Sequence, residues 1–158
     1  MSWCSKLSAP ALLPVLIAAS GPAHAQTARE TQVWGVAAAS KPAFYGAGVG
    51  LAWRDERRMR IAPAVALGSF GDGRFGARAD LAIHFLLDPV KRTGGAVYGG
   101  GGLSVAVRGS RLSPYALLVL GVEGSPGGGS GAFVEIGVGG GARLAIGYRW
   151  RKHNAPDR

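Results

Sequence analysis

The sequence predicts an all-β protein, an antiparallel up-and-down transmembrane β-barrel of eight strands that follows a cleaved signal peptide. The first reason is segment 44–54, where apolar and small side chains alternate at the period of two that a strand requires. The second is that this alternation returns along the chain between short turn-forming clusters. The third is that no helical periodicity appears after residue 25.

Residues 1–25 have the features of a secretory signal peptide. Lys6 supplies a positive charge, residues 7–19 are mostly apolar, and Ala23-His24-Ala25 is an A-x-A cleavage site. The apolar run is too short and too interrupted by proline to make a good membrane-spanning helix, and a buried core helix is the alternative. We therefore expect a bacterial protein that is exported across the inner membrane.

We therefore predict that the chain has three parts. They are the signal peptide at 1–25, the barrel domain at 26–150 and a polar C-terminal tail at 151–158. The only cysteine, Cys4, lies in the signal, so we expect neither a disulfide nor a thiolate metal site. Glycine accounts for 27 of the 158 residues without a G-X-Y repeat and is mixed with apolar residues, which excludes collagen and argues against disorder.

The strands follow from the alternating runs and from the turn residues between them. We expect strands at 32–39, 44–54, 59–69, 74–86, 95–108, 113–123, 131–138 and 142–150. The turns that separate them, in chain order, are 40–42, 55–58, 71–73, 88–89, 109–111, 124–131 and 139–141, all rich in Gly, Ser, Pro or Asp. Every predicted connection is short.

Four of these strands indicate which face meets lipid. The apolar faces, several with aromatic residues at their ends, are Tyr45, Ala47, Val49, Leu51 and Trp53; Met59, Ile61, Val65 and Leu67; Phe75, Ala77, Ala79, Leu81, Ile83 and Phe85; and Leu144, Ile146, Tyr148 and Trp150. The opposite faces carry Gly, Ala and charged residues. An arginine at the bilayer midplane costs about 2–4 kcal/mol, so we expect the charged faces to line the interior.

A soluble periplasmic barrel that binds a small apolar ligand is the alternative. It would reverse the faces, with Arg60, Arg78, Asp80, Arg143 and Arg149 on the solvent side. Rows of glycine and alanine are unusual on a solvent-exposed face, whereas they suit the narrow interior of an eight-stranded barrel. The pattern therefore favours the membrane barrel.

Three segments fit this scheme less well. Pro63 lies in the middle of a predicted strand, where its missing N–H predicts a bulge or a strained edge. The run 115–122 is apolar on both faces, so its facing is ambiguous. If the triglycine at 139–141 does not form a turn, the strands number seven instead of eight.

Few residues suggest chemistry. His84 lies on a predicted interior face, and Ser104 with Glu123 or Glu135 would complete a hydrolase triad on paper. No G-x-S-x-G elbow supports that triad, and no histidine spacing indicates a metal site. The glycine runs 99–102 and 137–141 lack a Walker ending, so we assign them to strand packing beside rings such as Tyr98. We predict no catalytic, cofactor-binding or metal site, and no cofactor.

The interior charges are expected to pair with one another. The inward carboxylates are Asp80, Glu123 and Glu135, and the inward arginines are Arg54, Arg60, Arg78, Arg108, Arg143 and Arg149. The net charge of +9 does not indicate nucleic-acid binding, because the arginines are dispersed and the chain is exported. The turn cations Arg57, Arg58, Lys91, Arg92, Arg151 and Lys152 are instead expected to meet lipid phosphates.

The sequence resembles the superfamily of small outer-membrane β-barrels of Gram-negative bacteria, of the eight-stranded OmpA and opacity type. The resemblance rests on the signal ending at 23–25, the strand that starts at Tyr45, the segment 115–123 and the closing segment 133–150. It implies insertion by the barrel-assembly machinery, for which Tyr148 and Trp150 would be the signal. The tail at 151–158 departs from barrels that end on the aromatic residue, and the absence of long loops argues against adhesion.

These observations predict a non-enzymatic protein of the bacterial outer membrane with a closed polar lumen and a structural, envelope-stabilising role. Its expected partners are outer-membrane lipids, including lipopolysaccharide, and we expect a monomer. A lipid-modifying barrel enzyme that uses His84 is the less favoured alternative, because no matching Ser/His motif is found.

Overall fold

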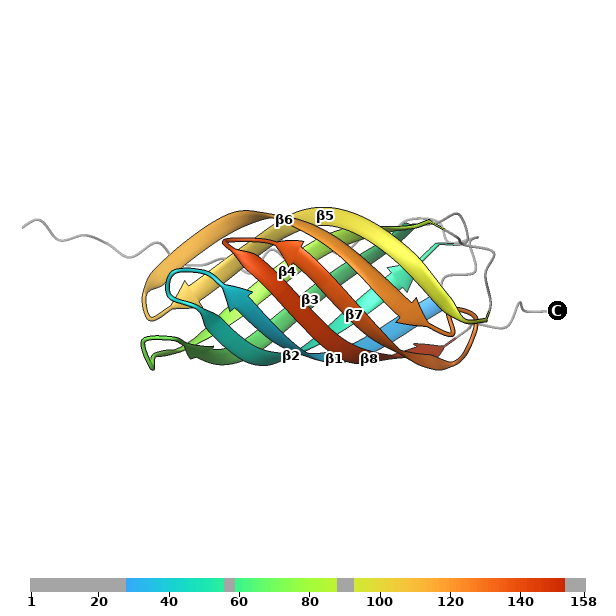
Figure 1. Ribbon diagram of the computed structural model, residues 1–158, viewed down its shortest axis with the longest axis horizontal. Coiled ribbons are helices and arrows are strands. Elements are labelled where there is room, and N and C mark those ends of the chain that lie inside the picture. The colour runs from blue at the N-terminus through green and yellow to red at the C-terminus, as the bar shows by residue number, and fades with distance from the viewer. Residues whose placement is uncertain (1–27, 56–58, 88–92, 153–158) are drawn as a thin grey trace, which may run out of the picture.

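Eight antiparallel strands close into one barrel in the computed structural model of the chain (Figure 1). The structure describes residues 28–55, 59–87 and 93–152. The strands are β1 (Ala28–Ala39), β2 (Phe44–Arg54), β3 (Met59–Phe70), β4 (Phe75–Leu86), β5 (Gly95–Arg108), β6 (Arg111–Gly124), β7 (Ser130–Val138) and β8 (Ala142–Lys152). Each strand pairs with the next, and β8 pairs with β1 to complete the ring. Within the described residues, no helix is long and apolar enough to cross a membrane.

The predicted strand order and number are confirmed. β2 and β5 have the predicted bounds, whereas β1 begins four residues before the predicted position and β8 ends two residues after it. The triglycine does form a turn between β7 and β8, because Gly140 and Gly141 adopt positive φ angles of 73° and 142° that favour glycine. The count is therefore eight. The signal peptide at 1–25 lies outside the described residues.

The two faces of the wall are those that the alternation predicts. The large apolar side chains point outward, and Tyr45 and Phe75 are 60% and 70% exposed. Arg60 and Arg149 point inward and are at most 1% exposed. The reversed facing that a soluble barrel requires is therefore wrong for this chain.

Two sequence ambiguities are resolved by the register. In β6 the odd residues Leu117 and Val119 are buried inside, and the even residues Leu118 and Leu120 are exposed outside. At Pro63 the ladder between β2 and β3 is interrupted, but the pairing has the same register on both sides of the gap. The missing N–H removes pairing without inserting a residue, so the predicted bulge is absent.

The interior differs between the two ends of the barrel. We call the end where β1 begins and β8 finishes the terminal end, and the opposite end the distal end (Figure 1). The interior of the terminal half carries most of the buried charges. Toward the distal end lies an apolar cluster that includes Trp34, Val36, Phe44, Phe70 and Phe133. The distal connections span only two to four residues, 40–43, 71–74, 109–110 and 139–141.

One glycine determines how an interior ring packs. Gly121 in β6 lies in the same row as Tyr98 of β5 and Glu135 of β7. A Cβ atom on Gly121 would collide with the Tyr98 ring, and the empty space lets the Tyr98 hydroxyl donate to Glu135 Oε2 at 3.3 Å. The space beside Tyr98 is therefore left by a glycine, as we expected, and this glycine lies on the neighbouring strand β6.

We expect Gly121→Ala to lower the free energy of unfolding by about 1–3 kcal/mol, because the added methyl overpacks against Tyr98. The matched control is Gly99→Ala, where the new Cβ makes only ordinary contacts, the nearest at 3.8 Å. That control is expected to be neutral or slightly stabilising. Urea unfolding in detergent micelles measures both, and equal effects would contradict this packing role.

Candidate functional site

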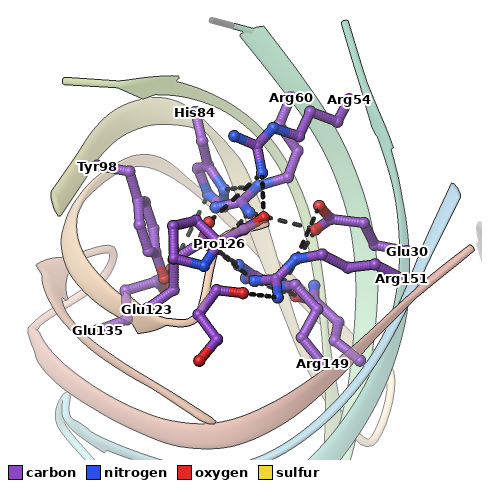
Figure 2. A network of polar contacts seen from close by, with 12 residues as sticks. Glu30, Arg54, Arg60, His84, Tyr98, Glu123, Pro126, Glu135, Arg149 and Arg151 are labelled. Atoms are coloured by element: carbon purple, nitrogen blue, oxygen red, sulfur yellow. Dashed lines mark hydrogen bonds and ion pairs between the residues drawn. The ribbon is translucent and has the colours of Figure 1, made fainter. Parts of the chain in front are cut away.

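The densest cluster of chemistry is an ion-pair network inside the terminal half of the barrel (Figure 2). Its centre is Glu123 of β6, which is 1% exposed. Glu123 contacts Arg60 Nη1 at 2.7 Å and Arg151 Nη2 at 3.3 Å, and it also accepts a hydrogen bond from Arg149. Arg54 Nη1 lies 3.8 Å from its other oxygen. One carboxylate therefore meets arginines from β2, β3 and β8.

A second carboxylate, Glu30 of β1, lies on the opposite side of the same arginines. Its oxygens are 3.2 Å from Arg60 Nη1, 3.4 Å from Arg149 Nε and 3.4 Å from Arg151 Nε. Glu30 faces Arg151 directly across the β1–β8 pairing, and Gln32 faces Arg149. Arg149 donates two hydrogen bonds to Gln32 Oε1, at 3.1 and 2.9 Å. Side chains of the network thus connect the two strands whose pairing closes the barrel.

His84 is part of this network, and one of its ring nitrogens is bound by an arginine. Its Nδ1 accepts a hydrogen bond from Arg60 Nε at 3.3 Å, and its Nε2 lies 3.9 Å from Glu135 Oε2. The ring also packs against Tyr98 with 5.0 Å between centroids, and the side chain is 3% exposed. A nitrogen that accepts a hydrogen bond from an arginine is not available as a general base.

The hydrolase triad considered from the sequence is not assembled. In the β4–β5 ladder His84 pairs with Gly100 and Asp80 pairs with Ser104, so Ser104 lies four residues away from the level of His84. At about 3.3 Å per residue, the two side chains are too far apart to share a proton. Ser104 instead accepts a hydrogen bond from Arg78 Nη2 at 2.8 Å.

A smaller charged group lies nearer the middle of the barrel. Arg143 of β8 contacts Asp80 at 2.8 Å and Glu135 at 3.2 Å. A cavity of about 30 Å³ lies beside these three side chains and His84. Atoms that border this region, among them Asp80 Oδ1 and Arg143 Nε, have no protein hydrogen-bond partner. A polar cavity of this size has room for a bridging water molecule.

Most of this interior agrees with the facing that the sequence predicts. Asp80, Glu123, Glu135, Arg60, Arg78, Arg143 and Arg149 are directed inward as predicted, Arg54 and Arg108 are partly buried, and Arg108 pairs with Asp72 at 3.0 Å. Glu30 and Gln32 were not identified as interior groups. Continuing the alternation of β1 backward from Trp34 would have placed both inside.

One prediction about the tail is wrong. Arg151 was assigned to lipid phosphates, but β8 continues through Lys152, and the Arg151 side chain is only 1% exposed between Glu30 and Glu123. The alternation of Arg143, Ala145, Gly147 and Arg149 leads to this inward position. Lys152 is exposed. The other cations assigned to lipid, Arg57, Arg58, Lys91 and Arg92, lie outside the described residues.

The described residues include no group of three or more His, Cys, Asp or Glu side chains placed to hold a metal ion. The geometry is that of a polar interior in which most of the buried charges form ion pairs with residues of other strands. What it can do chemically is hold the strands in register and exclude solvent and lipid from the terminal half of the barrel.

Comparison with solved structures shows which fold this is. The N-terminal β-barrel domain of Pseudomonas aeruginosa OprF superposes with a TM-score of 0.64 at 14% identity, over 81% of this chain and 99% of that one. Neisserial surface protein A (NspA) superposes with a TM-score of 0.60 at 10% identity, over 82% and 97%. The chain has the fold of the small outer-membrane β-barrels. No protein-family model and no curated protein sequence matches it.

We expect Glu123→Gln to destabilise the barrel by about 3–5 kcal/mol, because it removes one of the two carboxylates that the buried arginines of the network share. The control is Asp72→Asn, which removes the partly exposed pairs with Arg74 and Arg108 and should cost at most about 1 kcal/mol. Tryptophan fluorescence during urea unfolding measures both. A loss at Glu123 no larger than that at Asp72 would show that the network does not hold the barrel together.

Proposed function

We propose that the chain is a non-enzymatic protein of the bacterial outer membrane, a closed barrel with a structural, envelope-stabilising role. The observation that carries the proposal is the inverted distribution of side chains, with an apolar exterior around a charged interior. Soluble monomers rarely expose a contiguous apolar patch above a few hundred Å². Here apolar side chains form the outward face of all eight strands, including Val33, Leu51, Val65, Leu81, Leu103, Leu120, Ile136 and Ile146.

Aromatic residues at both ends of this apolar face support the membrane location. Tyr45 and Phe75 lie in one row at the distal end, both opposite Ser69 of β3. Trp53, Phe85 and Trp150 are exposed toward the terminal end. Aromatic girdles at the two interfaces are typical of outer-membrane barrels. The expected partners are therefore outer-membrane lipids, including lipopolysaccharide.

The last strand supports insertion by the barrel-assembly machinery. Tyr148 and Trp150 are both exposed on the outer face of β8, and their rings pack edge to face with centroids 5.1 Å apart. The closed ring of strand pairs leaves no complete edge strand for pairing with a second copy, which supports a monomer.

The interior supports a structural role in preference to transport. The terminal half is filled by the Glu123 network, and the distal half contains the apolar cluster around Trp34 and Phe44. A channel requires continuous open space between such layers. The short distal connections also give little surface for adhesion or receptor binding.

Val49→Arg tests the membrane location, because Val49 lies midway between Tyr45 and Trp53 on the outer face of β2 and is 56% exposed. In a bilayer we expect this change to cost about 2–4 kcal/mol, whereas Thr31→Arg, beside Trp150 near the terminal end, should cost about 0–1 kcal/mol. Unfolding from lipid vesicles measures both. A neutral Val49→Arg, or release of the wild-type protein with the periplasm, would rule the location out.

A current measurement tests the closed interior. The wild-type barrel, reconstituted in a planar bilayer beside a porin as positive control, is expected to give no sustained single-channel steps. Reproducible steps from the wild-type protein would overturn the closed-lumen role while leaving the membrane location intact.

A further inference from the structure

The distal end of the barrel contains a small pocket whose polar lining is strongly basic. It has a volume of about 190 Å³ and lies between the β1–β2 turn and the inner faces of β3, β4, β5 and β6. Lys41, Arg78, Arg108 and Arg111 line it, together with the hydroxyl-bearing residues Ser113 and Tyr115. Pockets that bind drug-sized ligands have volumes of about 300–1,000 Å³, so this smaller pocket suits a small charged group.

Arg78, which lines this pocket, differs from the other buried arginines in its partners. The arginines of the terminal network share Glu123 and Glu30, and Arg143 has Asp80 and Glu135. Among the described residues no carboxylate lies within ion-pair distance of Arg78, although its side chain is only 3% exposed. It donates from Nη2 to two neutral acceptors, Ser104 Oγ and the Gly139 carbonyl at 2.6 Å, and its Nε has no partner.

A buried guanidinium without a counter-charge is costly, and proteins normally pair such a group with an anion. Two of the neighbouring cations also lack a negatively charged partner. In the described part of the chain neither Lys41 nor Arg111 forms an ion pair, and Asp72, the acidic group at this rim, is occupied by Arg108 at 3.0 Å. Asp80, the inward carboxylate of β4, contacts Arg143 at 2.8 Å, so among the described residues these cations outnumber the carboxylates available to them.

We propose that the distal pocket binds a phosphate-class anion, with Arg78 at its base and Lys41, Arg108 and Arg111 around it. Guanidinium groups match the geometry of phosphate oxygens, and the hydroxyls of Ser113 and Tyr115 can donate to those oxygens as well. The anion is either free phosphate or the phosphate of a lipid headgroup. The pocket belongs to the barrel itself, so the inference does not depend on the proposed membrane role.

Titration calorimetry of the purified full barrel with inorganic phosphate, in detergent at low ionic strength, tests the site. We expect saturable binding that weakens about tenfold or more in Arg78→Gln and in Arg111→Gln. The matched control is Arg74→Gln, which removes an exposed positive charge in the neighbouring distal turn outside the pocket lining. It should change the dissociation constant by less than about twofold.

Arg111→Gln and Lys41→Gln keep the test decisive if Arg78→Gln does not fold, because Arg111 and Lys41 are exposed at the rim. No saturable phosphate binding by the wild-type barrel at millimolar concentrations would overturn the proposal. Equal weakening by Arg74→Gln and Arg111→Gln would also overturn it, since this would indicate a diffuse field without a site.

The two sources of the anion are separated in nanodiscs. If a lipid phosphate occupies the pocket, inorganic phosphate binds more weakly in nanodiscs of phosphatidic acid than in nanodiscs of phosphatidylcholine, and Arg111→Gln abolishes that difference. If free phosphate is the ligand, its affinity in the wild-type barrel is the same in both. Either result supports the pocket and identifies the source.

Discussion

The sharing of Glu123 by arginines from three strands is the interaction on which the rest of the structure depends. A barrel interior eight strands wide has room for side chains only, so a charge placed there cannot keep its hydration shell. Glu123 and Glu30 together contact Arg60, Arg149 and Arg151, and Glu30 faces Arg151 across the pairing that closes the ring. Each of these buried charges would be costly without a partner. Their mutual contacts therefore favour closure of the barrel with β1 and β8 in one register.

This interior explains why the exterior can be almost entirely apolar. Successive side chains of a strand point to opposite faces of the wall, so each residue lies either inside the barrel or on its outer surface. Once the charged and small residues are held inside, the outward positions carry Val, Leu, Ile and aromatic side chains. The glycines belong to the same arrangement. Gly121 lets Tyr98 cross to Glu135, and Gly48 lies against the ring of Trp34, so large rings fit a narrow interior.

The alternation of side chains is sufficient to predict the strands of the barrel but not the contacts between side chains in its interior. Strand number, order and facing follow from the period of two, which is a local property of the sequence. Which arginine meets which carboxylate depends on the stagger of strands far apart in the chain, such as β3 and β6, whose Arg60 and Glu123 are 63 residues apart. The strand ends were missed for another reason. Glu30 and Arg151 are charged residues beyond the last apolar ones, and polarity there was interpreted as loop and tail although the alternation continues through both.

The arginines at the two ends of the barrel differ in whether they have carboxylate partners. At the terminal end the arginines contact Glu30 and Glu123 of the chain itself. At the distal end no carboxylate of the described residues lies within ion-pair distance of Arg78, and Asp80, two residues along β4, contacts Arg143 instead. The connections there are also short, so no long loop can fold back to supply a counter-charge. Among the described residues, every arginine of the terminal network contacts a carboxylate, whereas Arg78, Lys41 and Arg111 at the distal end contact none, and the proposed anion at the distal rim offsets this difference.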